Sequence, residues 1–114
     1  MNNCNEFLSE SKTDIVLGQT TCSSKNDANL IAQGLLNKQL VACAQIEGPI
    51  SSRYIWKGKI EQSVEWKITL KFNEDNINPV TESLTKLHPY ENPEWVYWKA
   101  QSTAKYANWV DNPR

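Results

Sequence analysis

Apolar and polar residues alternate through residues 60–72, and this pattern constrains the fold more than any other in the chain. The apolar series is Ile60, Val64, Trp66, Ile68, Leu70 and Phe72, interrupted only at Gln62. Side chains of a β-strand point alternately to opposite faces, so this period of two predicts an antiparallel strand with one buried and one solvated face. Its thirteen residues exceed the usual length of about five or six. We therefore expect part of the strand to extend beyond its own domain.

The segment before this strand is predicted to fold back along it. Tyr54 and Trp56 share one face, and Lys57-Gly58-Lys59 supplies a tight turn. Residues 51–72 should therefore form one long hairpin. An exposed aromatic hairpin promotes aggregation unless another chain covers it. The sequence itself thus predicts an oligomer.

The first half of the chain predicts a strand, a helix and a second strand. Residues 14–21 begin with β-branched apolar residues and are typical of a strand. Ser24 has the spacing of a capping box, and apolar residues at helical spacing follow it, so residues 26–39 should form an amphipathic helix. Residues 41–46 are predicted as a mostly buried strand that breaks at Gly48-Pro49.

The second half repeats this alternation of helix and strand. Asn78-Pro79 is predicted as an N-cap followed by a first helical residue, and the apolar stripe of residues 77–87 ends at His88-Pro89. Residues 94–100 predict a short strand and residues 104–110 a last short helix. The order β-α-β-β-α-β with a terminal helix indicates an α+β fold, a ferredoxin-like split β-α-β sandwich.

Length and charge limit the classes of function. The chain has 114 residues, which fits one domain, residues 14–114, behind a flexible polar tail, residues 1–13. Twelve basic and thirteen acidic residues give a net charge of -1, so nothing indicates binding to nucleic acid or to an anionic membrane. No apolar run is long enough to span a membrane, and the tail lacks the apolar core of a secretory signal.

The cysteines indicate a reducing compartment. Cys4, Cys22 and Cys43 are odd in number and widely spaced, which fits neither a disulfide framework nor a zinc knuckle. We therefore expect the protein to be cytoplasmic.

His88, the single histidine, allows two interpretations. As a metal ligand it needs partners, which Glu91, Glu94 or a neighbouring subunit would supply. Alternatively it caps the end of the second helix, where a ring N–H or a positive charge favours the last carbonyls. Pro89 and Pro93 stiffen the segment under either interpretation.

The remaining polar residues give weaker signals. Trp56 fits either an interface anchor or the wall of a pocket. The charged residues on the polar face of the long strand are either solvated or, under a partner subunit, paired; they are Glu61, Glu65, Lys67 and Lys71. No phosphate-binding loop, dinucleotide motif or nucleophile elbow is present, so the residues do not support an enzyme.

Several short motifs stand in one order along the chain. They are Leu40-Val41-Ala42-Cys43, Ile46-x-Gly48, Ser52-x-Tyr54-x-Trp56-x-Gly58-x-Ile60-Glu61, Lys71, His88-Pro89-Tyr90-Glu91-x-Pro93-Glu94 and Tyr106-x-x-Trp109-Val110. In this combination the chain resembles the CutA family of divalent-ion tolerance proteins, over roughly residues 14–110.

The resemblance implies a trimer and a ligand site. Members of the family are homotrimers whose long hairpins wrap onto neighbouring subunits, much as in the trimeric PII signalling proteins, and the family is linked to copper and other divalent ions. The resemblance implies a cleft between subunits, to which we assign Tyr54, Trp56, Glu61, Lys71, His88, Tyr90, Glu91 and Glu94.

The chain also departs from the family pattern. Some members carry a cysteine at the end of the first strand and a second histidine before the His-Pro pair, both implicated in copper binding. Those positions hold Thr20 and Leu87 here, with Cys22 two residues beyond the first. Ser102 and Trp98 replace a glycine and a proline that are common in the family. Of the histidines implicated in copper binding, only His88 is left.

We therefore expect a cytoplasmic homotrimer that is not an enzyme and requires no cofactor. It would bind copper, another divalent metal or a small ligand in the cleft between subunits. Two alternatives stay open. One is a PII-like sensor of a metabolite or anion, with Lys71 and Trp56 in the cleft, and the other is a structural trimer that anchors a partner protein.

Overall fold

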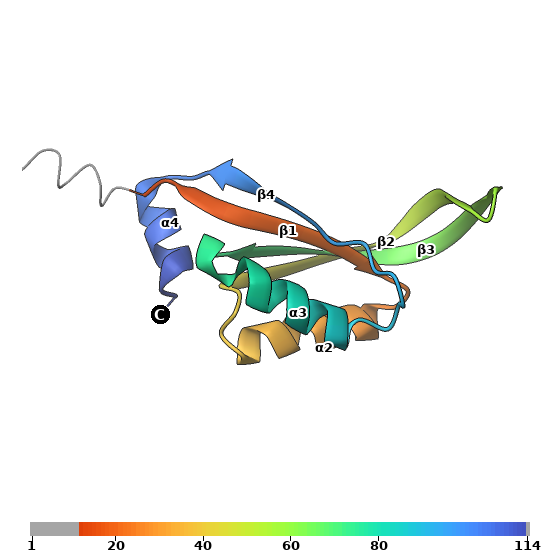
Figure 1. Ribbon diagram of the computed structural model, residues 1–114, viewed down its shortest axis with the longest axis horizontal. Helices are drawn as coiled ribbons and strands as arrows, with labels where there is room; N and C mark the ends of the chain where they lie inside the picture. Colours follow the sequence, from red (N-terminus) through yellow and green to blue (C-terminus); the bar gives the residue numbers. More distant parts are fainter. Residues whose placement is uncertain (1–11, 114) are drawn as a thin grey trace, which may run out of the picture.

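The computed structural model describes residues 12–113 as a four-stranded antiparallel sheet with helices packed on it (Figure 1). The strands are β1 (Asp14–Cys22), β2 (Cys43–Trp56), β3 (Lys59–Phe72) and β4 (Val96–Gln101), in the order β2-β3-β1-β4. The helices are α2 (Lys25–Asn37), α3 (Ile77–Leu87) and α4 (Ala104–Asp111), with a 3₁₀ turn, η1 (Glu74–Asn76), before α3. The predicted α+β fold with split β-α-β order is confirmed.

The predicted tail lies outside the described residues, apart from Lys12 and Thr13, and so does Cys4. Cys22 and Cys43 are both free thiols, and Cys22 is buried. Within residues 12–113, every helix is too short or too polar to cross a membrane.

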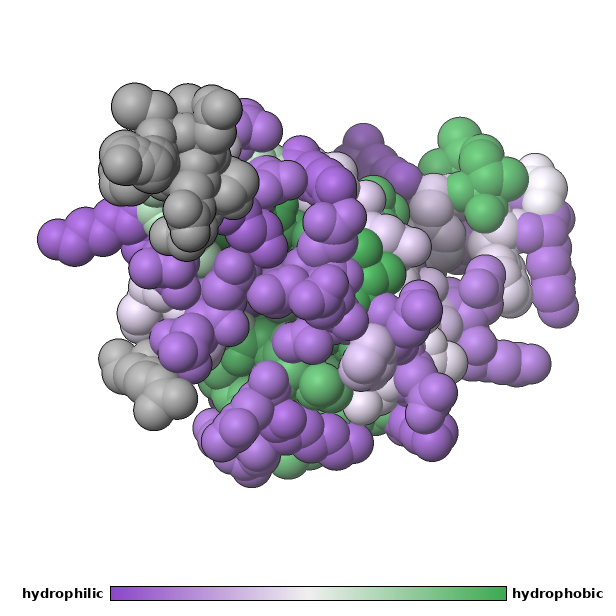
Figure 2. Space-filling model, turned by 60° about the vertical axis from the view of Figure 1, so that its left-hand side comes forward, coloured by the Kyte–Doolittle hydropathy of each residue, from purple (hydrophilic) through white to green (hydrophobic). Residues whose placement is uncertain are grey.

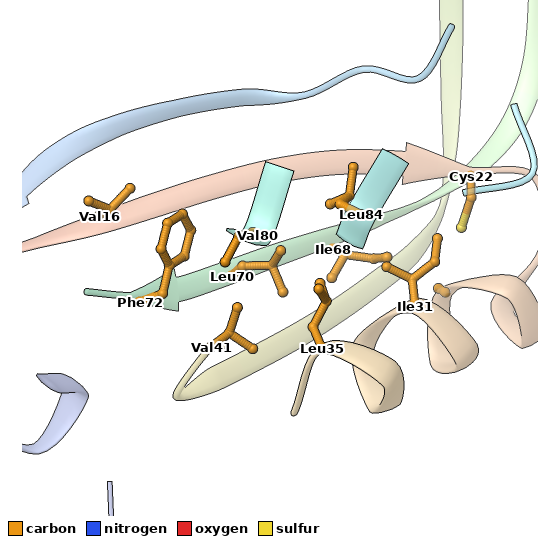
Figure 3. Packing of buried hydrophobic residues seen from close by; sticks show 11 residues of the cluster. Val16, Cys22, Ile31, Leu35, Val41, Ile68, Leu70, Phe72, Val80 and Leu84 are labelled. Carbon is orange, nitrogen blue, oxygen red and sulfur yellow. The ribbon is translucent and has the colours of Figure 1, made fainter. Parts of the chain in front are cut away.

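The main core lies between the sheet and the pair α2 and α3, which cover one face (Figures 1 and 3). It is formed by Val16, Cys22, Ala28, Ile31, Leu35, Val41, Ile68, Leu70, Phe72, Val80 and Leu84. The two helices approach closely because Gly34 of α2 has no side chain, and a Cβ there would lie 2.9 Å from Leu87 Cδ1. A smaller cluster under α4 consists of Ile15, Ala107 and Val110. Ile15 and Val16 are neighbours on β1 and face opposite sides of the sheet, so α4 covers the end of the second face.

Helix α2 begins at Lys25, one residue before the predicted range 26–39 and directly after the predicted N-cap. The Oγ of Ser24 accepts a hydrogen bond from the amide of Asp27 at 3.0 Å, which confirms the predicted N-cap. The helix ends two residues earlier than expected, at Asn37. Gln39 has a φ of 59°, a left-handed conformation that commonly follows a helix end.

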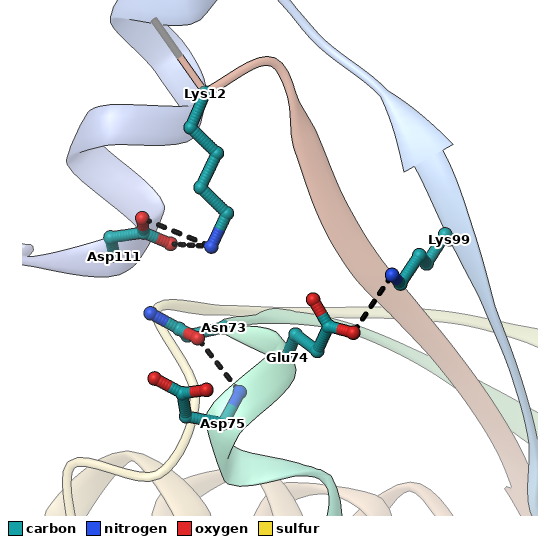
Figure 4. A network of polar contacts seen from close by, with 6 residues as sticks. All are labelled: Lys12, Asn73, Glu74, Asp75, Lys99 and Asp111. Atoms are coloured by element: carbon teal, nitrogen blue, oxygen red, sulfur yellow. Dashed lines mark hydrogen bonds and ion pairs between the residues drawn. The ribbon is translucent and has the colours of Figure 1, made fainter. Parts of the chain in front are cut away.

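Helix α3 begins earlier than the sequence predicts, and Asn78 is not its N-cap. The turn η1 precedes it, and Asn73 caps that turn by accepting a hydrogen bond from the amide of Asp75 at 2.8 Å (Figure 4). The helix then starts at Ile77, with Pro79 in its first turn. Proline is tolerated there because the first amides have no partner within the helix.

Two ion pairs, one exposed and one half-buried, join segments that are distant in the sequence (Figure 4). Lys99 on β4 lies 2.8 Å from Glu74 of η1, and Lys12 lies 3.2 Å from Asp111 at the end of α4. The hydrogen bond and the charge of Glu74 raise the pKa of Lys99. An exposed pair such as Lys99–Glu74 contributes little to stability.

The predicted break at Gly48-Pro49 is wrong, because β2 continues through it as one strand to Trp56. Glu47 pairs with Lys67, and the next printed pair is Ile50 with Glu65. Two residues of β2 therefore oppose only Trp66 on β3, which is the arrangement of a β-bulge. A bulge accommodates the proline and re-aims the strand without ending it.

Beyond the bulge the hairpin leaves the body of the protein, as predicted. We call residues 51–64 the arm; it projects to the right in Figure 1, and the molecule measures 62 × 28 × 22 Å. Lys57 and Gly58 both have positive φ, 51° and 78°, as the predicted two-residue turn requires. Four apolar residues of the arm are exposed: Ile55, Trp56, Ile60 and Val64. Figure 2 shows uncovered hydrophobic atoms on the projecting end.

Candidate functional site

An open groove of about 1350 Å³ lies between the arm and the segment that follows α3. The arm and the base of β3 supply one wall, the end of β1 supplies Thr21, and residues 90–94 supply the other wall. Charged and aromatic side chains dominate the lining: Glu61, Glu65, Glu91 and Glu94, one cation, Arg53, and three rings, Tyr54, Trp56 and Tyr90. The groove therefore presents mainly carboxylate oxygens and aromatic faces.

His88 lies behind the second wall and is buried, with 6% of its surface exposed. As the residue before Pro89 it leaves the helical conformation, with φ −75° and ψ 134°. Its Nε2 lies 2.8 Å from the carbonyl oxygen of Thr21, and its Nδ1 accepts a hydrogen bond from the amide of Tyr90 at 3.1 Å. A carbonyl can only accept, so Nε2 carries a proton; an amide N–H can only donate, so Nδ1 does not, and this pair of contacts is that of the neutral ring. Both ring nitrogens are occupied by the backbone.

Tyr90 connects this histidine to the floor of the groove. Its hydroxyl donates a hydrogen bond to Oε2 of Glu65 at 2.8 Å. Burial, and then the hydrogen bond and charge of Glu65, raise the pKa of Tyr90 to about 12. Glu65 itself is buried, with 8% exposed, and within residues 12–113 no basic side chain forms an ion pair with it. A buried carboxylate without a cation is unusual, because burial of an unpaired charge is costly.

The rest of the second wall is fixed at two further points. Glu94 accepts a hydrogen bond from Gln19 Nε2 at 3.0 Å. The indole of Trp95 donates to Thr81 Oγ1 at 2.8 Å, and its ring fills the space that a side chain at Gly18 would take. The wall is therefore held to β1 and to α3 rather than being a free loop.

The described part of the chain holds no preformed metal centre. Within residues 12–113 no three side chains from His, Cys, Asp and Glu are grouped closely enough to hold a metal ion. The groove carboxylates come from both walls and remain separated. A metal ion would need further ligands from a second subunit or from water.

The family resemblance suggested by the motifs is tested independently by comparing the whole chain with known protein families. Residues 16–113 match the sequence model of the family described as CutA1 divalent ion tolerance protein. The chain belongs to the CutA1 family. No metal, ligand or second subunit follows from that membership alone.

Two relatives show how much of the CutA1 chain is shared. The divalent-cation tolerance protein CutA of Thermotoga maritima is 36% identical over 97 residues, which cover 84% of this chain and 95% of that protein. The Protein CutA homolog of Xenopus laevis is 34% identical over 91 residues, 79% of this chain. The match spans only 60% of the Xenopus protein.

Solved CutA structures have the same fold. The CutA1 structure from Ehrlichia chaffeensis has a TM-score of 0.81 and 32% identity, and the match covers 86% of this chain and 92% of that one. The Archaeoglobus fulgidus protein, described as a periplasmic divalent cation tolerance protein, has a TM-score of 0.79 and 28% identity, with 85% and 94% covered.

Six of the eight residues assigned to the CutA1 cleft line the groove: Tyr54, Trp56, Glu61, Tyr90, Glu91 and Glu94. His88 stands behind the wall. Lys71 lies toward the other end of β3, where its Nζ donates to the Tyr106 hydroxyl at 3.3 Å and lies 5.4 Å from the ring centroid. Within one chain Lys71 is therefore not part of this groove.

Sequence reasoning missed Glu65 as a site residue. It treated Glu65 as one of several charges on a solvated strand face, and the alternating pattern gives no reason to separate it from Glu61. Glu65 is buried because Tyr90, distant in the sequence, covers it. Thr20 and Leu87, the two departures from the family pattern, also lie outside the groove, since Thr20 is buried and Leu87 packs against Gly34.

Proposed function

We propose that this CutA1 protein is a homotrimer that binds divalent cations in the groove, each site being completed by a neighbouring subunit. The observation that carries the proposal is the buried carboxylate of Glu65, held by Tyr90 at the floor of an acidic groove. Divalent cations such as copper, zinc or magnesium bind carboxylate oxygens to different degrees. A bound cation would also offset the cost of keeping Glu65 buried without a basic partner.

The charge of the groove favours a cation over an anion. Four carboxylates line it against one guanidinium, Arg53, and a cleft lined by one sign of charge concentrates the opposite ion. The lysine that an anion sensor would use, Lys71, lies elsewhere. The PII-like alternative therefore receives less support from this surface.

The arm supports the trimer. Its apolar residues Ile55, Ile60 and Val64 are exposed, and an exposed strand pair of this kind needs a cover. A second copy of the chain is the natural cover, because oligomers of one protein are closed and symmetric. The same contact would bring a neighbour to the open side of the groove, which the arm itself forms.

The proposed role is binding rather than catalysis, in the cytoplasm. The Tyr90 hydroxyl does lie against the Glu65 carboxylate, but its pKa is raised to about 12, the opposite of what an activated nucleophile needs. The residues of the groove instead fit recognition of a cation. Among the solved relatives, the Archaeoglobus protein is described as periplasmic, so fractionation of cells that express this chain is the direct measurement of its compartment.

The test is calorimetric titration of the purified protein with Cu²⁺ and with Zn²⁺. The variants are Glu65→Gln, which keeps an oxygen for the Tyr90 hydroxyl but removes the charge, and Glu82→Gln as a matched control on the exposed side of α3. We expect Glu65→Gln to weaken binding and Glu82→Gln to bind like the wild type. Equal binding by all three proteins would reject the groove as the site. If the wild type binds neither metal but its tryptophan fluorescence changes on addition of small anions, the sensor alternative is favoured.

A further inference from the structure

A closed set of contacts leads from His88 to the groove. The imidazole contacts Tyr90 twice, through the Tyr90 amide at Nδ1 and through the phenol ring, whose centroid lies 4.8 Å away. Tyr90 then holds Glu65 on β3. On its other side, the imidazole contacts Thr21 on β1. The residues next to Thr21 and Glu65, Cys22 and Trp66, pair with each other across β1 and β3. The set therefore begins and ends on the sheet.

The imidazole has no free atom with which to bind a metal. Its two nitrogens already bond to Thr21 and Tyr90, and the ring is buried and does not line the groove. To become a ligand, His88 would have to give up at least one of these hydrogen bonds. A buried group left without its partner is costly, so the observed arrangement opposes that change.

We propose that His88 is a positioning residue of the groove: it holds Tyr90, and through Tyr90 the Glu65 carboxylate, in place for a divalent cation that the imidazole itself does not touch. The part of this inference that concerns the cation rests on the proposed function. The order of contacts from His88 to Tyr90 to Glu65 can be tested without any cation.

The cation-free test uses nuclear magnetic resonance on the trimer or whichever oligomer the full chain forms. His88 is the only histidine in the sequence, so long-range ¹H–¹⁵N correlations report a single ring. We expect a neutral ring protonated at Nε2, and a Tyr90 amide protected from hydrogen exchange. His88→Leu should remove that protection, whereas His88→Asn, whose side-chain oxygen can replace Nδ1 as an acceptor, should retain part of it. A ring protonated at Nδ1, or a Tyr90 amide that stays protected in His88→Leu, would overturn the inference.

The cation test adds Zn²⁺, which is diamagnetic, to the same samples. Groups that hydrogen-bond to metal-binding side chains typically contribute about 10- to 100-fold to affinity, so we expect His88→Leu and Tyr90→Phe each to weaken Zn²⁺ binding by that order. The double variant should bind no more weakly than Tyr90→Phe alone, because His88 acts through Tyr90. Fully additive losses would show that His88 acts by another route. Zn²⁺-induced shifts of the His88 ring nitrogens to values typical of a metal ligand would overturn the inference outright.

Failure of the proposed function gives a different result from failure of this inference. If Zn²⁺ and Cu²⁺ bind neither wild type nor variants, the function is wrong, and the contacts are judged by the tautomer and by Tyr90 exchange alone. If His88→Leu does not fold, His88→Asn and the wild-type tautomer still decide the order of contacts.

Discussion

Thr20 is fully buried among apolar side chains, and its hydroxyl is the one buried side-chain polar atom within residues 12–113 that has no hydrogen-bond partner. An unpaired buried hydroxyl loses its bonds to water and gains nothing in return. Valine has nearly the same shape without that group. Position 20 therefore places a polar hydroxyl in an environment that gives it no hydrogen-bond partner.

We predict that Thr20→Val stabilises the protein by about 1 kcal/mol, because it removes the desolvation cost of the hydroxyl without leaving a cavity. Urea unfolding of the two proteins under identical conditions measures the difference. Thr85→Val is the control, since the Thr85 hydroxyl donates to the Thr81 carbonyl on an exposed helix face. A loss of stability in Thr20→Val would mean that the hydroxyl has a partner, such as an ordered water.

Tyr90 gives a prediction in alkaline solution. Its folded-state pKa of about 12 lies above the ordinary value of 10, so the folded protein keeps a proton that the unfolded chain releases. The stabilising contribution is complete below pH 10 and is lost as the pH rises toward about 12. We expect the stability difference between wild type and Tyr90→Phe to shrink over that range. Urea unfolding between about pH 9 and about pH 11, on either side of the ordinary tyrosine pKa, measures it. A difference that stays constant over this range would contradict the prediction.

At the residue level, the sequence limited the possible roles of His88 to two but did not decide between them. The two roles were metal ligand and helix cap, whereas the ring in the structure forms hydrogen bonds with Thr21 and Tyr90. The position is indeed the C-cap of α3, but the ring bonds to a strand 67 residues away in sequence. Local spacing cannot reveal a contact at that separation. The same limit hid the burial of Glu65.

At the level of elements, periodicity predicted nearly every helix and strand. The bulge in β2 is the main exception, because Gly-Pro is equally typical of the end of a strand and of a bulge within one. Only the partner strand decides between the two, through the register at Glu47 and Ile50. The early start of α3 has a similar origin, since Asn73 and Asn78 are both good capping residues and the sheet determines where the chain leaves β3.

The bulge also gives a prediction at this scale. A Cβ at Gly48 would lie 2.7 Å from the Trp66 ring and 3.2 Å from the Glu65 carbonyl, so the backbone and the indole would have to move apart. We predict that Gly48→Ala destabilises the protein by about 1–3 kcal/mol, the usual cost of overpacking. Urea unfolding measures it, with Gln45→Ala on the exposed part of the same strand as the control. An unchanged Gly48→Ala protein would show that Trp66 moves at no cost.

For the whole molecule, the long hairpin and its reach beyond the domain followed from sequence alone. The groove did not, because it exists only where the arm, the end of β1 and residues 90–94 come together. Of the residues assigned from the resemblance, six line this groove, and two, His88 and Lys71, lie elsewhere in a single chain. Lys71 would join a cleft of this kind only if a neighbouring subunit contributed it.

The arm gives the prediction for assembly. Ile60, 77% exposed, sits beside the turn and is proposed to be covered by a second copy. We predict that Ile60→Lys dissociates the proposed trimer at micromolar concentration, because a lysine buried in that interface without a partner is costly. Light scattering coupled to size exclusion measures the mass. Leu30→Lys, at an exposed leucine of α2, should leave the mass unchanged. If the wild type itself is monomeric, the proposed trimer and the site completed by a neighbouring subunit are both wrong.

Thr20 and Thr21 are neighbours on β1, yet one is buried in the core beneath α2 and α3 and the other lines the groove. Successive strand residues face opposite sides of the sheet, so a change at one position need not alter the other face. A substitution on the core face and a substitution on the groove face can therefore act largely independently. A deletion of one residue within the strand would exchange the two faces, so insertions and deletions there should be selected against much more strongly than substitutions.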